Sequence, residues 1–378
     1  MKKRIKISHL ATDEKYIGHA HDIFEDVFPE SNTFFIFGAE DWKYIPERGG
    51  NYKGVRKKYI PRGEFWKELK KSDVVVIHFL HIYFAWLVLL LPKKVSVVWV
   101  GWGGDYYGRI FPFYPANILL AETQSFFGEA SKGWEPLRWA LKKVHELIFW
   151  RAIKNIKIFS PVLESEHKVL EAYYPNKRIP NYVPWNYGEL ERNIISGVEG
   201  KRAEGRGVVI GNSAFPSNNH LEIFDVLAKN NVDRPILLPL AYGDIKYKER
   251  IRLLAQSTFG DAVSIIDQFM PIEEYNSLLL HCDVMIVNAR RQQALGNIIV
   301  ALYVGVKVFV REESPVYAFF KSKGVTIFTV EMLEKDFSLL DLKITDEQIA
   351  KARAVLLDHW GRKAMLAKTK QLVDAALA

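Results

Sequence analysis

Short apolar runs separated by amphipathic stretches recur along the first half of the chain. The runs are residues 5–7, 34–37, 74–77, 95–100 and 156–159. Between several of them the apolar residues follow helical spacing, as in residues 19–28 and 139–153. Strands that alternate with helices predict a parallel sheet covered on both faces.

The same alternation begins again after residue 206. Strands are predicted at residues 208–210, 236–238, 263–266, 284–287, 306–310 and 325–328, and helices at 221–229, 247–258, 272–281 and 298–303. Residues 175–206 are rich in proline, asparagine and glycine, which is typical of an interdomain connection. Thr345-Asp-Glu-Gln348 resembles a capping box. We therefore predict an α/β protein with domains at 1–180 and 207–345, a linker at 181–206 and closing helices at 346–378.

Composition narrows the class of protein without choosing a ligand. A chain of 378 residues suits two domains, and 49% hydrophobic with 25% charged residues is typical of a folded soluble protein. The net charge of +8 favours anionic partners, such as nucleotides, acidic glycans, nucleic acid or an anionic membrane face. The single cysteine, Cys282, excludes an intramolecular disulfide and fits a reducing cytoplasm.

Neither a signal peptide nor a membrane-spanning helix is expected. The N-terminus runs directly into a strand pattern and lacks the apolar core of a signal peptide. The most hydrophobic segment, residues 79–91, falls short of the ~20 residues that cross a bilayer.

Residues 288–297, Asn-Ala-Arg-Arg-Gln-Gln-Ala-Leu-Gly-Asn, form a polar loop between a predicted strand and a predicted helix. Open α/β sheets bind ligands at the carboxyl ends of their strands. The first turn of the next helix carries Gly296 and Asn297 and offers unpaired N–H groups to an anion. Arg291 can hold a diphosphate by two charge-assisted bonds, and the two glutamines after it suit sugar hydroxyls or an acetamido group. A solvated loop without a ligand is the alternative.

Three other loops follow strands of the second half and reach the same predicted sheet edge. In the first, Gly211 permits close backbone approach, and Asn212 and Ser213 can donate to phosphate oxygens. In the second, Tyr242 can stack on a base or a sugar ring, and in the third, Gln268 is placed to read a base edge or ribose. The alternatives are a turn with a helix cap for the first loop, simple packing for Tyr242, and a third loop whose Glu273 and Glu274 serve only the helix dipole. The convergence of four loops at one edge favours a ligand site.

Strand ends in the first half carry candidates for acid–base chemistry. Residues 8–13 follow the first predicted strand, so we expect His9 and Asp13 to reach the cleft, and His78 ends another strand. Asp105 closes a glycine-rich loop that can bend around a ligand. Asp13 or Asp105 is a candidate general base for an acceptor hydroxyl. A hydrogen-bonded structural role is the alternative for each of these residues.

Residues 106–157 combine aromatic and basic side chains. An aromatic face beside a basic one resembles an interfacial membrane segment, although a core helix with a solvated face explains the pattern equally well. The residues concerned are Tyr106, Tyr107, Arg109, Phe111, Phe113, Tyr114, Trp139, Lys142, Lys143, Phe149, Trp150, Arg151, Lys154 and Lys157.

Common motifs of metal, nucleophile and dinucleotide chemistry are missing from the sequence. It contains no HExxH, CxxC, GxSxG, Walker A or N-terminal GxGxxG pattern. We therefore expect no metal and no cofactor, and dehydrogenase and P-loop functions are disfavoured.

Together these motifs resemble those of the bacterial 4-acetamido-4,6-dideoxygalactose transferases of glycosyltransferase family 56, which act in enterobacterial common antigen assembly. The resemblance is densest between residues 211 and 313. The matching residues there are Gly211-Asn-Ser213, Ser217-Asn218, His220, Tyr242 and Ala289-Arg-Arg-Gln-Gln-Ala-Leu-Gly296. Trp102-Gly-Gly-Asp-Tyr106 is similar to the family's Trp-Gly-Ala-Asp-Leu-Tyr segment, and Asp13 and His78 fall at matching places. Ala294 replaces the glycine that follows the family's paired glutamines.

The resemblance implies a GT-B glycosyltransferase, in which two Rossmann-like domains face a cleft and the C-terminal one binds a dTDP-linked 4-acetamido-4,6-dideoxygalactose. It implies a polyprenyl-diphosphate-linked saccharide as acceptor, and a cytoplasmic enzyme that is peripheral on the inner membrane face. No nucleic-acid partner is expected. The implied donor-binding residues are Gly211, Asn212, Ser213, His220, Tyr242, Gln268, Arg291, Gln292, Gln293, Gly296 and Asn297. The candidate catalytic residues are Asp13, Asp105 and His78.

Two alternatives and the stereochemistry stay open at this point. A nucleotide-sugar epimerase on the same fold would turn over without an acceptor, and a non-catalytic nucleotide-sugar or glycan-binding protein would not turn over at all. If the transfer inverts configuration, an aspartate base is needed. If it retains configuration, Asp13 and Asp105 would instead position the acceptor.

Overall fold

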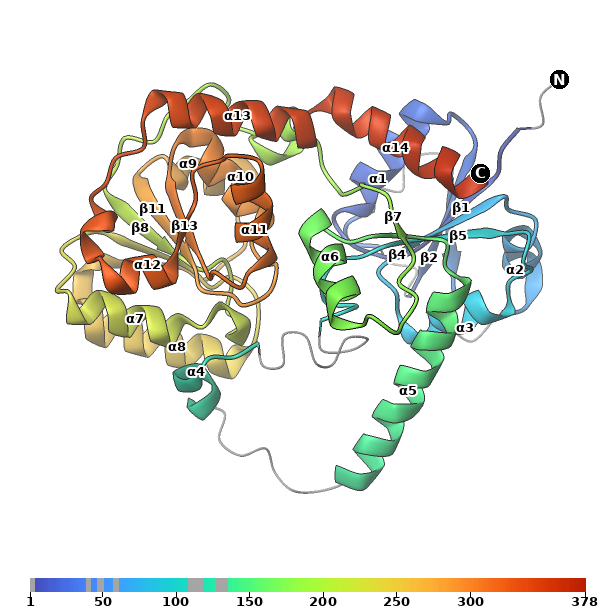
Figure 1. Cartoon of the computed structure of the whole chain (residues 1–378), viewed down its shortest axis with the longest axis horizontal. Coiled ribbons are helices and arrows are strands. Elements are labelled where there is room, and N and C mark those ends of the chain that lie inside the picture. The colour runs from blue at the N-terminus through green and yellow to red at the C-terminus, as the bar shows by residue number, and fades with distance from the viewer. Residues whose placement is uncertain (1–3, 39–41, 46–50, 57–60, 108–117, 127–134) are drawn as a thin grey trace. The chain divides into compact units, whose positions relative to one another are not determined.

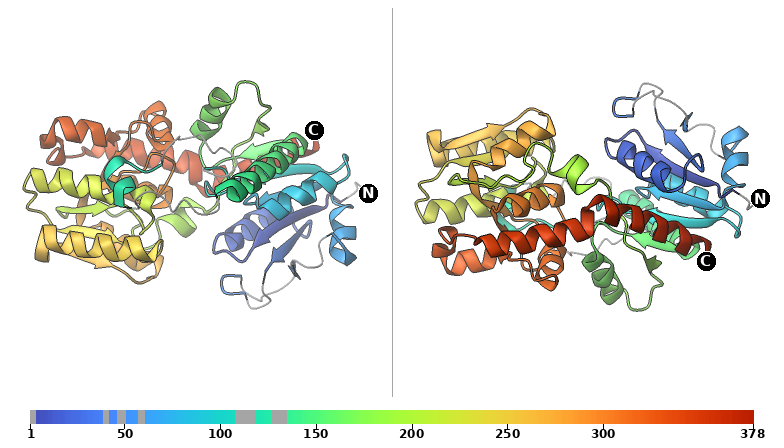
Figure 2. Two further views of the ribbon diagram at one scale, coloured as in Figure 1. Left: turned by 90° about the horizontal axis from the view of Figure 1, so that it is seen from below. Right: turned by 90° about the horizontal axis from the view of Figure 1, so that it is seen from above.

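The chain folds as two compact units, each built on one parallel sheet with helices on both faces (Figures 1 and 2). The computed structural model describes residues 4–38, 42–45, 51–56, 61–107, 118–126 and 135–378. The first unit comprises Met1–Tyr114, Gly133–Glu189 and Arg362–Ala378, and the second comprises Pro115–Lys132 and Leu190–Gly361.

The sheet of the first unit has the strand order β3-β2-β1-β4-β5-β6-β7, and every pairing among the described strands is parallel. The strands are β1 Ile7–Thr12, β2 Asn32–Phe37, β3 Tyr52–Val55, β4 Val74–His78, β5 Ser96–Val100, β6 Ile158–Ser160 and β7 Asn181–Tyr182. The helices of this unit are α1 Ile17–Val27, α2 Gly63–Leu69, α3 Ile82–Leu90, α5 Glu135–Asn155, α6 Glu164–Tyr173 and α14 Arg362–Leu377.

Alternate residues of each central strand enter opposite cores. On β4, Val74 and Val76 pack in the core that includes α1 and α14, whereas Val75 and Ile77 pack in the core that includes α3 and α5. Since both faces are covered, the central strands are mostly apolar on both faces instead of alternating with polar residues. This burial explains the continuous apolar runs in the sequence.

The second unit repeats this architecture with the strand order β10-β9-β8-β11-β12-β13. Its strands are β8 Gly207–Ile210, β9 Ile236–Pro239, β10 Val263–Ile266, β11 Cys282–Val287, β12 Lys307–Val310 and β13 Phe328–Thr329. Its α-helices are α4 Ala121–Phe126, α7 His220–Lys229, α8 Ile245–Phe259, α9 Ile272–Leu279, α10 Leu295–Val304, α11 Pro315–Ser322, α12 Val330–Lys335 and α13 Asp346–Trp360. Shorter helical turns are η2 Leu190–Ile194, η3 Pro216–Asn218, η4 Gly260–Ala262 and η5 Phe337–Leu340.

Both sheets change winding direction at one place, the topological switch point. In the first unit β1 lies beside β4, and in the second β8 lies beside β11, so successive connections run outward in opposite directions from each pair. The loops that leave the carboxyl ends of these two strands diverge, and the crevice between such loops is the usual ligand site of an open parallel sheet.

The two parallel α/β domains agree with the sequence prediction, but the unit boundaries differ from those expected. β7 lies inside the segment expected to be a linker, and β3 was missed because residues 52–55 carry few apolar side chains. The capping box at Thr345 is present and begins α13. The closing helices are nevertheless divided between the units, since Gly361 has an extended backbone and ends α13.

Polar contacts explain why α4 joins the second unit although it lies in the first half of the sequence. The Glu222 carboxylate accepts hydrogen bonds from the Thr123 backbone N–H and hydroxyl, at 2.9 and 2.7 Å. The Asn219 Oδ1 accepts from the Leu120 backbone N–H at 2.9 Å. These partners are about a hundred residues apart in the sequence, so no local pattern indicates the pairing.

A buried lysine on β12 generates a pH-dependent stability. The Lys307 side chain is 1% exposed, and its Nζ donates to the Leu340 carbonyl oxygen at 2.9 Å. Burial lowers the pKa of Lys307 to about 8. A lysine in the unfolded chain has a pKa of about 10.4. Between about pH 8 and pH 10.4 the unfolded chain therefore binds more protons than the folded one. Stability is therefore expected to rise with pH across this window.

Lys307→Met removes the titrating group. We predict that the free energy of unfolding of the wild type, relative to that of Lys307→Met, rises by about 1–3 kcal/mol when the pH is raised from 8 to 10.5. Urea unfolding of both proteins at several pH values measures this difference. Lys246→Met, at an exposed position on α8, is the control and should give a flat difference. A flat difference for Lys307→Met as well would contradict the prediction.

Candidate functional site

Polar loops converge at the carboxyl edge of the second sheet, around its switch point. One loop joins β8 to α7, a second joins β9 to α8, and a third joins β11 to α10. The first two loops are tied by backbone hydrogen bonds, because the Ala214 N–H donates to the Tyr242 carbonyl at 2.7 Å and the Asp244 N–H donates to the Ala214 carbonyl at 3.1 Å. The loops therefore form one continuous surface.

Four polar side chains from these loops form a hydrogen-bonded network. The Ser217 hydroxyl donates to Gln293 Oε1 at 2.7 Å, and Gln293 Nε2 donates to Asn212 Oδ1 at 3.1 Å. Asn212 Nδ2 then donates to the Tyr242 hydroxyl at 2.9 Å. The network joins three of the sequence-predicted donor residues, Asn212, Tyr242 and Gln293, and it orients both carboxamides. Gln293 is only 7% exposed, and its two hydrogen bonds fix the orientation of its carboxamide.

Gly211 begins the first loop in a backbone conformation that requires glycine. Its φ is +67°, and a Cβ atom there would lie 2.7 Å from His220 Nε2 and 3.1 Å from Asn218 Oδ1. Both of these atoms are buried and have no hydrogen-bond partner in the structure. Ser213, the next predicted donor residue, is also buried, and its hydroxyl accepts from Asn218 Nδ2 at 3.1 Å.

His220 lies behind the loop in a neutral state. Its side chain is fully buried, its Nδ1 lies 3.2 Å from the Tyr247 hydroxyl, and burial lowers its pKa to about 3. The histidine at this position therefore supports the loop from within. Its predicted contact with a donor remains a prediction.

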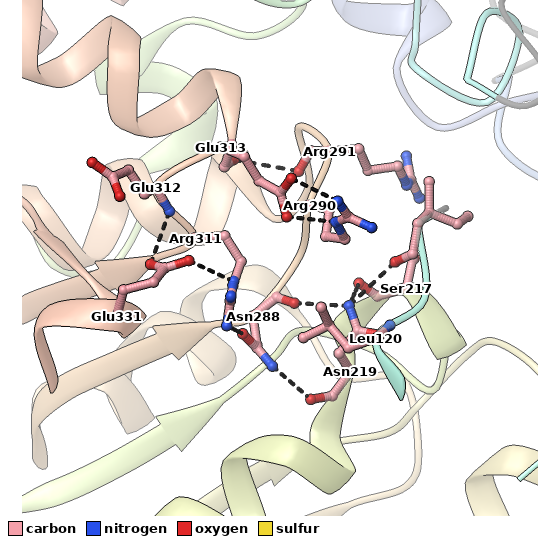
Figure 3. Close-up of polar contacts among 12 residues, drawn as sticks. Leu120, Ser217, Asn219, Asn288, Arg290, Arg291, Arg311, Glu312, Glu313 and Glu331 are labelled. Atoms are coloured by element: carbon pink, nitrogen blue, oxygen red, sulfur yellow. Dashed lines mark hydrogen bonds and ion pairs between the residues drawn. The ribbon is translucent and has the colours of Figure 1, made fainter. Parts of the chain in front are cut away.

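A reciprocal pair of asparagines ties the first loop to the third (Figure 3). Asn219 Nδ2 donates to the Asn288 carbonyl at 2.9 Å, and Asn288 Nδ2 donates to the Asn219 carbonyl at 3.0 Å. Sequence reasoning missed Asn219 because an asparagine beside a helix start is most simply a cap. In the structure its φ is +48°, and it makes no side-chain capping bond to α7.

The two arginines of the third loop have different surroundings (Figure 3). Arg290 forms a bidentate ion pair with Glu313, with Nε–Oε1 and Nη2–Oε2 distances of 2.5 and 2.8 Å. Arg291, the predicted diphosphate ligand, donates from Nη1 to the Gln292 carbonyl at 3.4 Å. The Glu313 carboxylate thus holds the Arg290 guanidinium, and the diphosphate contact of Arg291 remains a prediction.

The N-terminus of α10 follows this loop directly. Ala294 is the N-cap residue and adopts a left-handed conformation, with φ of 59° and ψ of 21°. Gly296, in the first turn, is exposed, and a Cβ atom at that position would meet nothing within 4 Å. The first turn of α10 is therefore open to a ligand at this position. Gln292, by contrast, is buried at 7% exposure.

Of the predicted donor residues outside the network, Gln268 and Asn297 have surroundings of their own. Gln268 is exposed on the loop after β10, which is an edge strand of the described sheet and is two strands away from β8. Asn297 donates from Nδ2 to the Tyr275 hydroxyl at 2.8 Å and so connects α10 to α9. Neither residue shares a hydrogen bond with Asn212 or Gln293 in the structure.

Asp13, a predicted base of the first unit, accepts several backbone hydrogen bonds. Its Oδ2 accepts from the Lys43 N–H at 2.6 Å, and its Oδ1 accepts from the N–H groups of Tyr44 and Ile45 at 3.1 Å each. This carboxylate anchors the segment after β2. A base role for Asp13 is a prediction that competes with this structural one.

Asp105 is fully buried at the end of β5. Its carboxylate accepts from the Trp99 indole N–H at 2.7 Å and from the N–H groups of Leu80 and Trp102 at 3.0 and 2.9 Å. Burial raises the pKa of Asp105, and these hydrogen bonds oppose that rise. The geometry describes a clamp between the ends of β4 and β5, and a base role for Asp105 also remains a prediction.

His9 and His78 lie in the interior of the first unit. Strand β1 extends to Thr12, so His9 is a strand residue and not the loop residue that the sequence suggested. His9 Nδ1 lies 3.0 Å from His78 Nε2, and both side chains are at most 1% exposed. His78 therefore reaches a ligand only through another residue.

Two observations concern metal and thiol groups in the part of the chain that the structure describes, and the expected absence of a metal stays a prediction. No group of three or more histidine, cysteine, aspartate and glutamate side chains there is arranged to hold a metal ion. Cys282 is buried, and burial raises the pKa of its thiol to about 12.

Comparison with known families identifies the class of enzyme. Residues 184–361 match the family described as 4-alpha-L-fucosyltransferase glycosyl transferase group 56. The chain is a glycosyltransferase. The matched region contains the whole amide network and the N-terminus of α10, so the family assignment and the geometry concern the same loops. The assignment favours a transferase over an epimerase or a non-catalytic binding protein.

Solved structures with the same fold cover nearly the whole of this glycosyltransferase. A glycosyltransferase from Rickettsia africae is 12% identical, with 99% of each chain covered and a TM-score of 0.63. Sucrose-phosphate synthase from Thermosynechococcus elongatus is 11% identical, with 98% of each chain covered and a TM-score of 0.64. The UDP-forming α,α-trehalose-phosphate synthase from Burkholderia xenovorans is 11% identical, with 99% and 100% covered and a TM-score of 0.61. These likenesses establish the GT-B fold.

The left-handed conformation of Ala294 generates a prediction about stability. An L-residue pays about 1–2 kcal/mol in this conformation, whereas glycine pays only about 0.5–1 kcal/mol of additional entropy. We expect Ala294→Gly to raise the free energy of unfolding by about 0.5–1 kcal/mol in urea titrations. Ala354→Gly, at an exposed position in the middle of α13, is the matched control and should lower it by about 1 kcal/mol. Destabilisation by both substitutions would show that Ala294 is not strained.

Proposed function

We propose that this glycosyltransferase moves a 4-acetamido-4,6-dideoxygalactose-type sugar from a dTDP-sugar to a polyprenyl-diphosphate-linked saccharide in cell-surface polysaccharide synthesis. The observation that carries the proposal is the Ser217–Gln293–Asn212–Tyr242 network at the switch point of the second sheet. The fucosyltransferase description of the matching family supports a 6-deoxyhexose as the transferred sugar, since fucose is 6-deoxygalactose.

The diphosphate of the donor would bind at the first turn of α10. This helix begins at Leu295 and has ten residues, so its N-terminal N–H groups and dipole attract an anion. Arg291 precedes this turn and brings a guanidinium group to the proposed diphosphate, whereas the Arg290 guanidinium is held by Glu313. Gly211 would allow the backbone of the first loop to approach the phosphates from the other side.

The sugar would be read by the oriented carboxamides. Gln293 and Asn212 each present a donor and an acceptor, which match the N–H and C=O of an acetamido group. Because the network already orients both amides, little side-chain entropy is lost when the sugar binds. Gln292 and Asn297, on the same loop and helix, complete the proposed donor set.

The nucleoside would lie against exposed aromatic rings of the first two loops. Phe215 and Tyr242 are 45% and 46% exposed, and their rings form an edge-to-face pair with centroids 5.9 Å apart. Exposed aromatic faces offer stacking surfaces to a thymine base. Gln268, exposed on the next loop, would hydrogen-bond the base or the ribose.

The donor assignment predicts separate effects at Arg291 and Gln293. Saturating dTDP should raise the melting temperature by several degrees. At a dTDP concentration one hundred times its Kd, binding stabilises the folded state by about 2.7 kcal/mol. Arg291→Ala should weaken both dTDP and the dTDP-sugar about tenfold to a hundredfold through the lost charge-assisted bonds. Gln293→Ala should weaken the dTDP-sugar more than dTDP.

Thermal-shift titrations with dTDP, UDP, GDP and CMP measure these effects. Gln256→Ala, at an exposed position on α8, is the matched control and should bind like the wild type. Stabilisation by neither dTDP nor UDP would overturn the proposed donor class.

The acceptor's lipid carrier implies contact with a membrane surface, and two helices of the first unit carry side chains suited to it. Among the described residues, no helix has both the length and the hydropathy to span a bilayer. Instead, the neighbouring helices α3 and α5 carry apolar side chains that are about half exposed. These are Trp86, Leu90, Leu141, Val144 and Leu147.

This apolar face is largely aliphatic, in contrast to the aromatic face expected from residues 106–157. Tyr106, Tyr107 and Phe149 are buried in the core. Arg109, Phe111, Phe113 and Tyr114 lie outside the described residues, as do the side chains of Trp139 and Lys142. Exposed Lys93, Lys94, Arg151 and Lys154 on or beside the two helices supply positive charge. Exposed leucines with basic neighbours fit the interface of an anionic bilayer.

We predict that the protein binds vesicles made of equal parts phosphatidylglycerol and phosphatidylcholine, and that Leu141→Glu with Leu147→Glu weakens this binding more than tenfold. Each leucine buried in the interface contributes about 1.5–3 kcal/mol, and each added carboxylate is repelled by the anionic lipid. Vesicle co-sedimentation measures the partition. Leu253→Glu, at a 57% exposed position on α8, is the control. Equal partition of all three proteins would exclude this membrane face.

A further inference from the structure

A buried chain of hydrogen bonds runs through the switch point of the first sheet. His9 on β1 lies between Asn32 on β2 and His78 on β4, with Nε2–Oδ1 and Nδ1–Nε2 distances of 3.2 and 3.0 Å. His78 Nδ1 lies 2.5 Å from the Tyr187 hydroxyl. Asn32, His9 and His78 are each at most 2% exposed, whereas Tyr187 is only partly buried. The chain thus ends at the residue that is nearest to solvent.

Asn32, at the buried end of this series of hydrogen bonds, decides which atom donates and which accepts at each step. Asn32 Nδ2 donates to Glu25 Oε1 and to the Phe28 carbonyl, at 2.9 Å each. The Glu25 carboxylate accepts a further hydrogen bond from the Asn51 side chain at 2.9 Å. With the amide nitrogen committed to two acceptors, Asn32 Oδ1 must be the atom that faces His9.

The protonation of both histidines follows from this orientation. Since Asn32 Oδ1 only accepts, His9 Nε2 carries its proton, and in the neutral ring His9 Nδ1 is then an acceptor. His78 Nε2 must donate to it, which leaves His78 Nδ1 as an acceptor. The Tyr187 hydroxyl therefore donates to His78, and its oxygen is left to accept. The Trp102 indole N–H is a neighbouring donor to this oxygen, which keeps a second lone pair for a ligand.

The surroundings of Tyr187 are suited to a sugar ring. Tyr16, which is 40% exposed, and Trp102, which is partly buried, lie beside it, with centroids 5.9 and 5.4 Å from that of Tyr187. Tyr16 and Trp102 are themselves edge-to-face at 6.0 Å. These rings come from the segments that follow β1 and β5, and Tyr187 comes from the segment that follows β7, so all lie beyond carboxyl ends of strands. A sugar ring has apolar C–H faces and polar hydroxyls. The three aromatic rings can contact such a face, while the Tyr187 oxygen accepts from one hydroxyl.

We propose that the Tyr187 oxygen accepts a hydrogen bond from a hydroxyl of the acceptor saccharide, and that the Asn32–His9–His78 chain orients it to do so. This inference rests on the proposed function, which gives the enzyme a saccharide acceptor, and it adds the place on the first unit where that saccharide binds. Tyr187 is then a substrate contact, and His78, which a ligand does not reach directly, is a positioning residue.

The chain orients the hydroxyl and does not remove a proton from the acceptor. A proton passed from Tyr187 would have to rest on His78 or His9, deep in the apolar core. Burial lowers the pKa of His78 to about 3 and that of His9 well below its ordinary value. A buried imidazolium next to a second histidine is too costly to serve as the proton sink. The histidines therefore stay neutral throughout.

The direction of the chain is testable on the full-length protein by ¹⁵N NMR with labelled histidine at pH 7. His9 and His78 should both be neutral and protonated on Nε2. Tyr187→Phe should shift the Nδ1 resonance of His78, and Tyr173→Phe, at an exposed position on α6, should leave it unchanged. A His78 proton on Nδ1, or no response to Tyr187→Phe, would overturn the assignment.

Saccharide contact is testable with an array of immobilised di- and trisaccharides of bacterial hexoses and N-acetylhexosamines. We expect Tyr187→Phe to bind about fivefold to tenfold more weakly than the wild type, the effect of one neutral hydrogen bond. His78→Leu should match it, and His78→Gln, which keeps a donor and an acceptor, should restore binding. Tyr173→Phe is again the control.

The same proteins titrated with dTDP separate this inference from the proposed donor. Tyr187→Phe should keep the thermal stabilisation by dTDP of the wild type, because the nucleotide is assigned to the second unit. Equal saccharide binding by Tyr187→Phe and the wild type, or no binding by the wild type, overturns the saccharide contact. If dTDP does not stabilise the wild type, the donor assignment is wrong, and the saccharide contact is tested separately by the array.

Discussion

Burial of both faces of each parallel sheet is the constraint on which the rest of this glycosyltransferase depends. Helices cover the two faces, so the central strands are mostly apolar, and the few polar residues on them, such as His9 and His78, are buried with hydrogen-bond partners. Ligand-binding polar side chains are then left to the loops at the strand ends. The strand order decides which loops matter, because only at β1–β4 and β8–β11 do neighbouring connections diverge.

The two units use their switch points differently. In the second unit the polar side chains come from loops and form a network that ends at the exposed ring of Tyr242. In the first unit the polar groups sit on the strands themselves, and their chain through His9 and His78 ends at the partly buried Tyr187. The first arrangement presents several hydrogen-bonding groups, as a nucleotide-sugar needs. The second presents one oriented oxygen among aromatic rings, as a single hydroxyl of a saccharide needs.

Asp13 and Asp105 show that the surroundings of a carboxylate, and not its position in the sequence, indicate its role. Asp13 and Asp105 stand at strand ends, where sequence reasoning places a general base. In the structure each accepts three or more hydrogen bonds, mostly from backbone N–H groups that would otherwise lack a partner. Such carboxylates hold loops in place, and an isolated sequence position does not distinguish this role from catalysis.

The sequence by itself determined two parallel α/β domains and the polar loops at the ends of β8, β9 and β11, because apolar periodicity and turn residues are local signals. It also singled out Ala294, whose left-handed backbone explains why a glycine suits that position. Only the tertiary structure decided that His9 is buried, that Asn219 pairs with Asn288, and that α4 and α14 each join a unit distant in sequence. The physical reason is that these contacts join residues tens to hundreds of positions apart, and strand pairing and core packing alone bring them together.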